Sequence, residues 1–334
     1  MMKMTAKKKR MTALISLGAG ICVFAGAAFA NYTTSGGYSV YKKAIIGALG
    51  EENYTLNADV SLKIDGKEIS SGNTKEMFSE KGDANLYKES TSVYYDGTES
   101  SYKTYMQDNI SIQIYDDGEA QVMDGERSKQ RYNPKNGSSL NGGIDMDRET
   151  DQKMVRFVEL LADTFMGDLK NNFVYVSGDD NSKKYELTLD GMQVPEFVNA
   201  GLSAAFSSMS NNEYNQDDPT LALGKDPVVR SASTIFTVDN EGRLLHNDLR
   251  AELIGKGRDG AEHSLVLDIS INMSDYGTTT PPKADLENLK ISYQESKDAN
   301  SVDYDVEDGV TITKEIDADG NVRVVFPEEA EVVE

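Results

Sequence analysis

Apolar and polar residues alternate most regularly between Arg243 and Pro282. Two runs in this stretch, Leu245–Leu253 and Leu265–Met273, place an apolar side chain at nearly every second position. A period of two is typical of strands with one face buried and the other in water. The two runs therefore predict one long antiparallel hairpin. Each arm covers about ten residues, whereas most strands have five or six, which favours a large, curved sheet.

Similar alternation occurs earlier in the chain. Residues Tyr54–Ile64 alternate without exception, and Gly-containing turn signals then recur up to Asp124-Gly125. This pattern predicts an antiparallel meander over residues 54–132. Shorter strands are expected at Phe173–Ser177, Lys184–Leu189 and Ser231–Val238.

Three other segments, residues 38–49, 147–169 and 195–209, carry apolar residues at helical spacing instead. Pro195 suits the first turn of the third helix. Asn211–Asp226 is rich in Asn, Asp and Pro, and we expect an exposed insertion there. The combination predicts an α+β fold, in which one curved antiparallel sheet carries the second and third helices on its concave face.

Residues 1–30 have the pattern of a secretory signal. Five basic residues precede an apolar run, Met11–Phe24, and the segment ends in Ala28-Phe29-Ala30. Cleavage after Ala30 is expected, which makes the protein extracytoplasmic and secreted. The alternative is an uncleaved segment, since about 20 apolar and small residues are just long enough to anchor a chain in a membrane. Lipid attachment at Cys22 is not expected, because Gly20-Ile21 precedes it instead of the motif that lipidation needs.

Charge and cysteine content narrow the class of protein further. Cys22 is the only cysteine, so a cleaved chain has neither disulfides nor a thiolate zinc site. The formal charge of -22 includes +5 from residues 1–30, which leaves -27 on the remainder. Such a chain repels nucleic acid. Residues 31–297 are expected to form one domain, followed by an acidic tail over residues 298–334 in which Val310–Ile316 could pair with Val322–Phe326.

The sequence contains little that indicates catalysis. His246 and His263 are the only histidines, and two imidazoles without a cysteine support a zinc site poorly. Asp239–Gly242 and Asp317–Asn321 resemble calcium loops superficially, but they lack the full twelve-residue pattern and are interpreted as turns. Neither a G-x-S-x-G elbow nor a phosphate-binding glycine loop is present. We therefore expect no enzymatic activity, no cofactor and no metal.

The region from Ser231 to Pro282 resembles the LolA/LppX-like lipoprotein-carrier superfamily. A strand ends in an Asp-x-x-Gly-Arg-Leu turn, a long hairpin follows, and a Tyr-Gly pair and two prolines come after it. In this sequence those residues are Asp239, Gly242, Arg243, Leu244, Tyr276, Gly277, Pro281 and Pro282. The resemblance implies an unclosed, half-barrel sheet with helices on its concave side and an apolar cavity for acyl chains between them. The chain departs from the family pattern in its acidic tail and in lacking a lipobox cysteine.

Two functions fit these observations. In the first, the protein carries or senses a lipid or lipopeptide in an apolar cavity. In the second, side chains fill the interior, and the protein is a cell-envelope interaction or signalling module with a protein partner. The residues expected to surround the cavity share the apolar positions of their strands and helices. They are Leu56, Val60, Leu62, Phe157, Leu161, Phe206, Met209, Leu267, Ile269 and Ile271.

Overall fold

A computed structural model describes residues 36–81, 84–108, 110–116, 118–123, 172–194, 196–210, 219–257, 259–285, 290–293, 313–316 and 322–325. The expected signal or anchor at residues 1–30 and the expected helix at residues 147–169 lie outside these ranges. In the part of the chain that is described, no helix is both long and apolar enough to cross a membrane.

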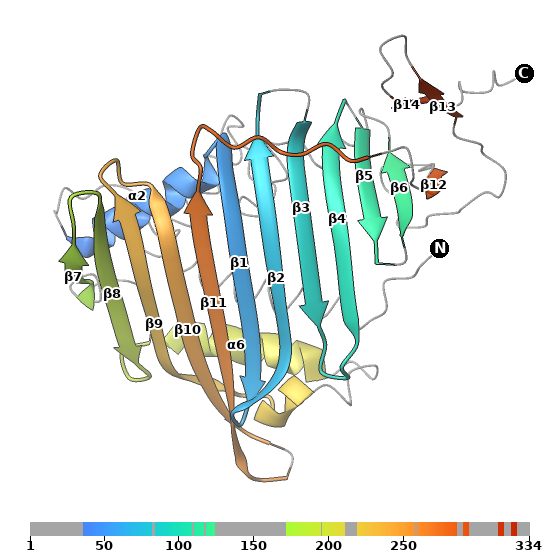
Figure 1. The fold of residues 1–334 in the computed structure, drawn as a ribbon. Helices are drawn as coiled ribbons and strands as arrows, with labels where there is room; N and C mark the ends of the chain where they lie inside the picture. The colour runs from blue at the N-terminus through green and yellow to red at the C-terminus, as the bar shows by residue number, and fades with distance from the viewer. Residues whose placement is uncertain are drawn as a thin grey trace, which may run out of the picture.

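One open sheet dominates the fold (Figure 1). Its strands are β1 (Asn53–Ile64), β2 (Lys67–Ser79), β3 (Ala84–Val93), β4 (Glu99–Gln107), β5 (Ile110–Tyr115), β6 (Glu119–Met123), β7 (Val174–Gly178), β8 (Ser182–Asp190), β9 (Val228–Asp239), β10 (Leu244–Lys256), β11 (Glu262–Ser274) and β12 (Lys290–Tyr293). Their spatial order is β12-β6-β5-β4-β3-β2-β1-β11-β10-β9-β8-β7. Eleven strands pair antiparallel, and β12 joins β6 in parallel. Because the strands at the two ends of this order are not neighbours, the sheet does not close.

The predicted hairpin is confirmed as β10 and β11, with Leu249 opposite Ile269. Strand β1 pairs along the other side of β11, with Val60 also opposite Ile269. The meander from β1 to β6 and the later strands therefore meet at the β1–β11 pair. A separate pair, β13 (Thr313–Ile316) and β14 (Val322–Val325), lies within the two tail segments that the sequence suggests as partners.

Two α-helices are described, α2 (Gly37–Leu49) and α6 (Glu196–Ser210). The first ends before Gly50, as its sequence predicts. The second covers the expected segment but begins at Glu196, and Pro195, expected in its first turn, lies outside the described residues. The prediction that Asn211–Asp226 is an exposed insertion is partly wrong. Pro219–Leu223 forms a 3-10 helix, η3, whose Leu223 is fully buried. The reason is the apolar side chains of Ala222 and Leu223, which pack in the cluster beneath α6.

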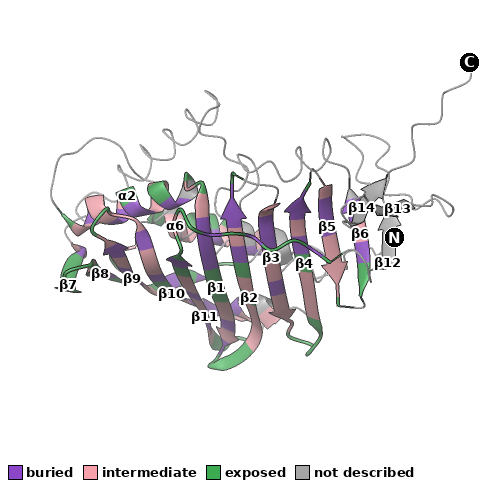
Figure 2. Cartoon of the chain, turned by 45° about the horizontal axis from the view of Figure 1, so that its top comes forward, coloured by how far each residue is buried: buried purple, intermediate pink, exposed green. Residues whose placement is uncertain are grey.

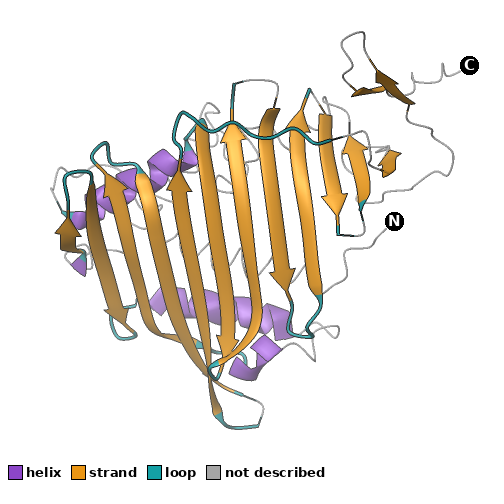
Figure 3. Cartoon of the chain, viewed as in Figure 1, coloured by secondary structure: helices purple, strands orange, loops and turns teal. Residues whose placement is uncertain are grey.

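Both helices pack on the same face of the sheet, which we call the helix face; it carries the even-numbered side chains of β1. Tyr41 of α2 packs in a cluster with Leu56, and Phe206 of α6 packs in a second cluster with Leu62. Figure 3 shows both helices behind the sheet, and Figure 2 shows buried and less buried positions along its strands. The sheet and the two helices thus form two layers with two core clusters between them.

A polar contact also ties α2 to the sheet. Asn247 interrupts the apolar alternation of β10, yet it is only 1% exposed. Its side-chain oxygen accepts a hydrogen bond from Thr234 Oγ1 at 2.7 Å, and its Nδ2 donates to the Tyr41 hydroxyl at 3.4 Å. Because buried polar groups are costly unless they are paired, these bonds explain how Asn247 occupies an apolar position.

The opposite face is crossed by residues 275–285, which we call the strap. Figure 1 shows the strap in front of the strands, on the side away from the helices. Thr279 Oγ1 lies 2.8 Å from Thr55 Oγ1, and the Ala284 amide donates to Gln107 Oε1. Ala284 also packs with Ile112 in a small core on this strap face. The sheet therefore does not finish at Pro281-Pro282, since the chain crosses it and adds β12 at the far edge.

Candidate ligand-binding face

The strand residues expected to line a cavity all lie on the helix face. The β1–β11 register places Leu62 opposite Leu267 and Val60 opposite Ile269. Ile271 lies opposite Ala58, which is the next residue after Leu56 on the same side of β1. Direct cross-strand partners share a face of the sheet and approach within about 5 Å. The alternation of apolar positions therefore brought six residues from two distant segments to one surface.

The expected helical residues are placed only in part. Phe206 is fully buried and packs in the cluster that contains Leu62, with Leu267 partly buried against the same cluster. Phe157, Leu161 and the side chain of Met209 lie outside the described residues.

A row of apolar side chains crosses the sheet between the two core clusters. It consists of Val60, Ile269 and Leu249, which are direct partners across β1, β11 and β10. Ile269 is 7% exposed, whereas Val60 and Leu249 are half-buried. Among the described residues, the clusters under α2 and under α6 include none of these three. We call this the seam row.

The side chains become small where the seam row continues into the meander. Val60 lies opposite Gly72 of β2, and Gly72 lies opposite Ser92 of β3. Glycine and serine rise less above the sheet than the leucine and phenylalanine side chains of the neighbouring clusters. Large apolar side chains of the strands themselves thus do not occupy this part of the helix face.

One row of the helix face is polar across the meander, beside the apolar row of Phe78, Leu86 and Met106, and the sequence did not reveal it. Five direct cross-strand partners on β2 to β6 form what we call the polar ladder: Glu76, Lys88, Thr104, Gln113 and Gln121. Leu56 lies opposite Glu76, so the ladder continues from the apolar half of the same face. A bulge in the β1–β2 pairing at Leu62/Lys63 contributes to this register. Alternation within one strand contains no signal of such a shift.

The first members of the ladder are buried and partnered. Glu76 is 1% exposed and accepts a hydrogen bond of 2.7 Å from the Tyr54 hydroxyl. The Lys88 ammonium lies 3.8 Å from the same carboxylate, and its side chain is 24% exposed. Thr104 is 2% exposed. The ladder therefore begins with a compensated pair of charges and continues as uncharged hydroxyl and amide groups.

Both neighbouring rows add polar groups to the ladder. On one side, Thr74 Oγ1 and Ser90 Oγ lie 2.9 Å apart, and the Tyr115 hydroxyl donates to Gln121 at 3.2 Å. On the other side, Ser111 is fully buried, and within the described residues its Oγ has no hydrogen-bond partner. A buried hydroxyl without a partner loses its hydration with no compensation.

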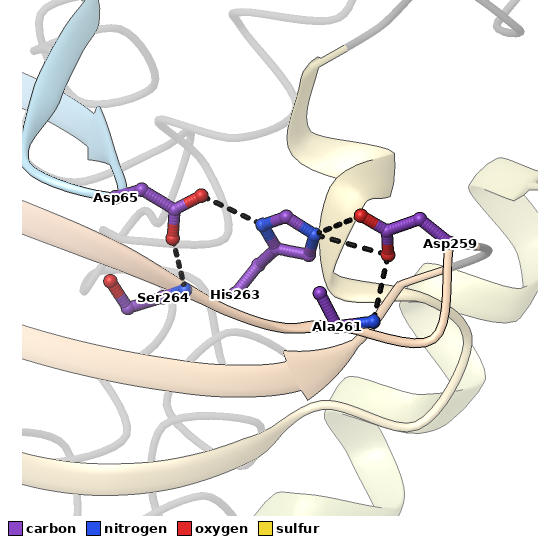
Figure 4. A network of polar contacts seen from close by, with 5 residues as sticks. All are labelled: Asp65, Asp259, Ala261, His263 and Ser264. Atoms are coloured by element: carbon purple, nitrogen blue, oxygen red, sulfur yellow. Dashed lines mark hydrogen bonds and ion pairs between the residues drawn. The ribbon is translucent and has the colours of Figure 1, made fainter.

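The two histidines are half-buried and lie away from the seam row. His246 is on the strap face, as its polar position in the strand predicts, and its Nε2 lies 2.9 Å from Asp248. His263 lies between two carboxylates, with Nδ1 2.7 Å from Asp65 and Nε2 3.1 Å from Asp259 (Figure 4). Hydrogen bonds to Asp65 and then Asp259 raise the pKa of His263. We call these three residues the His263 latch, because it joins the β1–β2 turn to the β10–β11 loop.

The Asp239–Gly242 segment is a turn closed by its own side chains. Asp239 Oδ1 accepts the Arg243 amide at 2.9 Å, and Asp239 Oδ2 accepts the Arg243 guanidinium at 2.7 Å. Gly242 has a φ of 84°, a left-handed conformation that favours glycine. Arg243 also lies over the ring of Tyr276, whose hydroxyl donates to the Leu244 carbonyl. Five of the residues that carry the resemblance, Asp239, Gly242, Arg243, Leu244 and Tyr276, thus form one structural unit. Asp317–Asn321 lies outside the described residues.

Comparison with known proteins gives weak likenesses. No family model and no curated protein matches the chain. A crystal structure of a LolA superfamily protein from Nitrosomonas europaea matches at 13% identity, with a TM-score of 0.18, over 72% of this chain and 95% of the other. A beta-barrel-like protein of a domain of unknown function from Brucella abortus matches at 10% identity, with a TM-score of 0.16, over 67% of this chain and 99% of the other. With TM-scores this low, neither likeness assigns the chain to a family.

Proposed function

We propose that the protein binds a hydrophobic ligand, a lipid or lipopeptide, on the helix face, and that it carries or senses this ligand outside the cytoplasm. The observation behind the proposal is the seam row. Val60 and Leu249 are half-buried although they lie in the middle of the sheet, between two core clusters. Apolar surface that the fold leaves partly exposed is stabilised when an acyl chain covers it.

The shape of the sheet supports this proposal. An open sheet with both helices on one face is compatible with a half-barrel whose concave side is the helix face. In that arrangement α2 and α6 flank the seam row, and an acyl chain lies between them. Small side chains at Gly72 and Ser92 extend the row toward the meander.

The proposal involves binding without a chemical step. His246 is on the strap face, and His263 lies at the end of the β10–β11 hairpin, so neither imidazole adjoins the seam row.

The proposed location outside the cytoplasm rests on the basic and apolar pattern of residues 1–30. Terminal sequencing of protein from cells and medium tests it, with Asn31 as the expected first residue. A first residue near Met1 would indicate a membrane tether.

Lipid binding is tested with two tryptophan variants on one strand. Val60→Trp fills the seam row, whereas Asp59→Trp adds the same bulk to the exposed, opposite face. We expect Val60→Trp to weaken the binding of a fluorescent fatty acid by about tenfold or more, which corresponds to about 1.4 kcal/mol. Asp59→Trp should bind like the unmodified protein. Circular dichroism checks that both variants retain the sheet.

Mass spectrometry of organic extracts from the purified protein provides an independent measurement. A bound lipid in the unmodified protein, reduced in Val60→Trp, supports the proposal. If extracts contain no lipid and the unmodified protein binds no fatty acid, the ligand proposal is wrong. The interaction-module hypothesis would then be favoured.

A further inference from the structure

We propose that the polar ladder binds the uncharged, hydroxyl-rich headgroup of an amphiphile whose acyl chain lies along the seam row. This inference rests on the proposed lipid binding and specifies the class of ligand. The ladder and the seam row occupy the same face of one sheet, since Val60 and Leu56 are both helix-face residues of β1, and Glu76 lies opposite Leu56. A single amphiphile can therefore contact both.

The composition of the ladder is the first reason. Phe78, Leu86 and Met106 continue the apolar cluster of β1 across the meander. In the row beside them, Glu76 and Thr104 are polar and yet almost completely buried. Buried polar groups are costly unless partners satisfy them. The ladder places these two buried groups in a row with the half-buried Lys88, Gln113 and Gln121, which can hydrogen-bond to a polar ligand.

The unsatisfied hydroxyl of Ser111 is the second reason, and it is independent of the first. Ser111 is the direct partner of Met106, two positions along β4 from Thr104, so it lies diagonally across from the ladder. Diagonal neighbours of this kind are roughly 7 Å apart. In the described part of the chain, Ser111 Oγ is buried and has no hydrogen-bond partner. A hydroxyl of a bound headgroup would supply the missing bond.

The charges favour a neutral headgroup over an anionic one. The Lys88 ammonium lies 3.8 Å from the Glu76 carboxylate, so the two formal charges offset each other. A phosphate or carboxylate at Lys88 would also approach Glu76 and would enter a chain with a formal charge of -22. The remaining groups are hydroxyls and amides, which donate and accept hydrogen bonds as sugar hydroxyls require.

Two tyrosines complete the surface. Tyr102 and Tyr115 are direct partners on the helix face, and each lies two positions from a ladder residue on its own strand, Thr104 and Gln113 respectively. Both are half-buried. A tyrosine ring offers an apolar face and a polar edge. A sugar ring has the complementary arrangement, with C–H groups on its faces and hydroxyls around its rim.

The experiment compares three ligands with the same dodecyl chain and different heads: dodecyl glucoside, dodecylphosphocholine and dodecanoate. Each is titrated below its micelle concentration into delipidated full-length protein, and displacement of a fluorescent fatty acid is measured. The expected result is that the glucoside binds about fivefold or more tightly than the other two. Thr104→Val should remove that preference and leave dodecanoate binding unchanged.

Thr91→Val is the matched control, because Thr91 is a meander threonine on the strap face. It should bind all three ligands like the unmodified protein. Equal affinities for the three heads in the unmodified protein would overturn the headgroup inference while leaving lipid binding intact. If Thr104→Val reduced the affinity for all three ligands equally, the ladder would have a structural role only. If the unmodified protein binds none of the ligands, the proposed function itself fails.

Discussion

Leu56 of β1 and Glu76 of β2 are direct cross-strand partners on the helix face, and they are 2% and 1% exposed. The first belongs to the apolar cluster beneath α2, and the second begins the polar ladder. The row of direct partners that begins at Leu56 therefore changes from apolar to polar between two adjacent strands, whereas Phe78, Leu86 and Met106 keep the next row apolar. Val60 of the seam row lies four positions along β1 from Leu56, which is roughly 13 Å at about 3.3 Å per residue, so the proposed ligand would span that distance between its acyl chain and its headgroup.

Tyr54→Phe should destabilise the fold by removing the hydrogen bond to Glu76. The carboxylate is buried and would lose a donor at 2.7 Å, so we expect the free energy of unfolding to fall by about 1–3 kcal/mol. Urea denaturation measures the change. Tyr175→Phe is the control, because Tyr175 is 57% exposed, and its effect should stay within about 0.5 kcal/mol. Equal effects of the two changes would contradict the role assigned to Tyr54.

His263→Asn should reduce stability by an amount that depends on pH. Because its partners raise the pKa of His263 above 6.5, its contribution is complete below pH 6.5 and disappears as the pH rises through the raised value. Hydrogen bonding from His263 lowers the pKa of Asp65 below 3.8; the Ala261 amide, followed by His263, lowers that of Asp259. Their contribution disappears as the pH falls below 3.8.

The difference between unmodified protein and His263→Asn should therefore be largest between pH 3.8 and 6.5. Urea denaturation of both proteins within that interval and at alkaline pH measures it. A difference that is the same at every pH would show that the His263 latch acts by packing and not by charge.

Thr279→Val should loosen the strap. Thr279 and Thr55 are both 6% exposed, and their hydroxyls lie 2.8 Å apart. The change leaves the Thr55 hydroxyl buried without this partner, at an expected cost of about 1–3 kcal/mol in the free energy of unfolding. Thr278→Val is the matched control at an exposed neighbouring position. The assigned anchor would be wrong if hydrogen exchange and urea denaturation gave the same result for both variants.

Two glycine substitutions should act in opposite directions. Gly201 is exposed within α6 and has space for a side chain, so Gly201→Ala should stabilise the protein by about 0.5–1 kcal/mol through helix propensity. A Cβ at Gly255 would come within 2.0 Å of the Leu223 carbonyl oxygen. Gly255→Ala should therefore displace η3 from β10 and destabilise by about 1–3 kcal/mol. Thermal unfolding compares the two; a stabilising Gly255→Ala would refute this contact.

Alternation by itself identified the β10–β11 hairpin and the buried side of β1. This works because successive side chains of a strand point to opposite faces, a property of the local backbone. It explains why Leu56, Val60 and Leu62 are all on the helix face with Leu267, Ile269 and Ile271. The helix that ends before Gly50 and the helix over Glu196–Ser210 were likewise predicted from local sequence. The expected contribution of Phe157 and Leu161 to the cavity lining stays a prediction.

Only the tertiary structure decided which strands are neighbours and which polar residues meet. Asp65 and His263 are 198 positions apart in sequence, and they meet because β1 pairs with β11. The polar ladder depends on four successive registers, and its position opposite Leu56 depends on a fifth, the β1–β2 pairing with its bulge at Leu62/Lys63. A shift of one residue moves every side chain of a strand to the other face. The sequence of each strand therefore determined which of its residues lie on the same side of that strand. Long-range pairing decided that Glu76, Lys88 and Thr104 share the helix face.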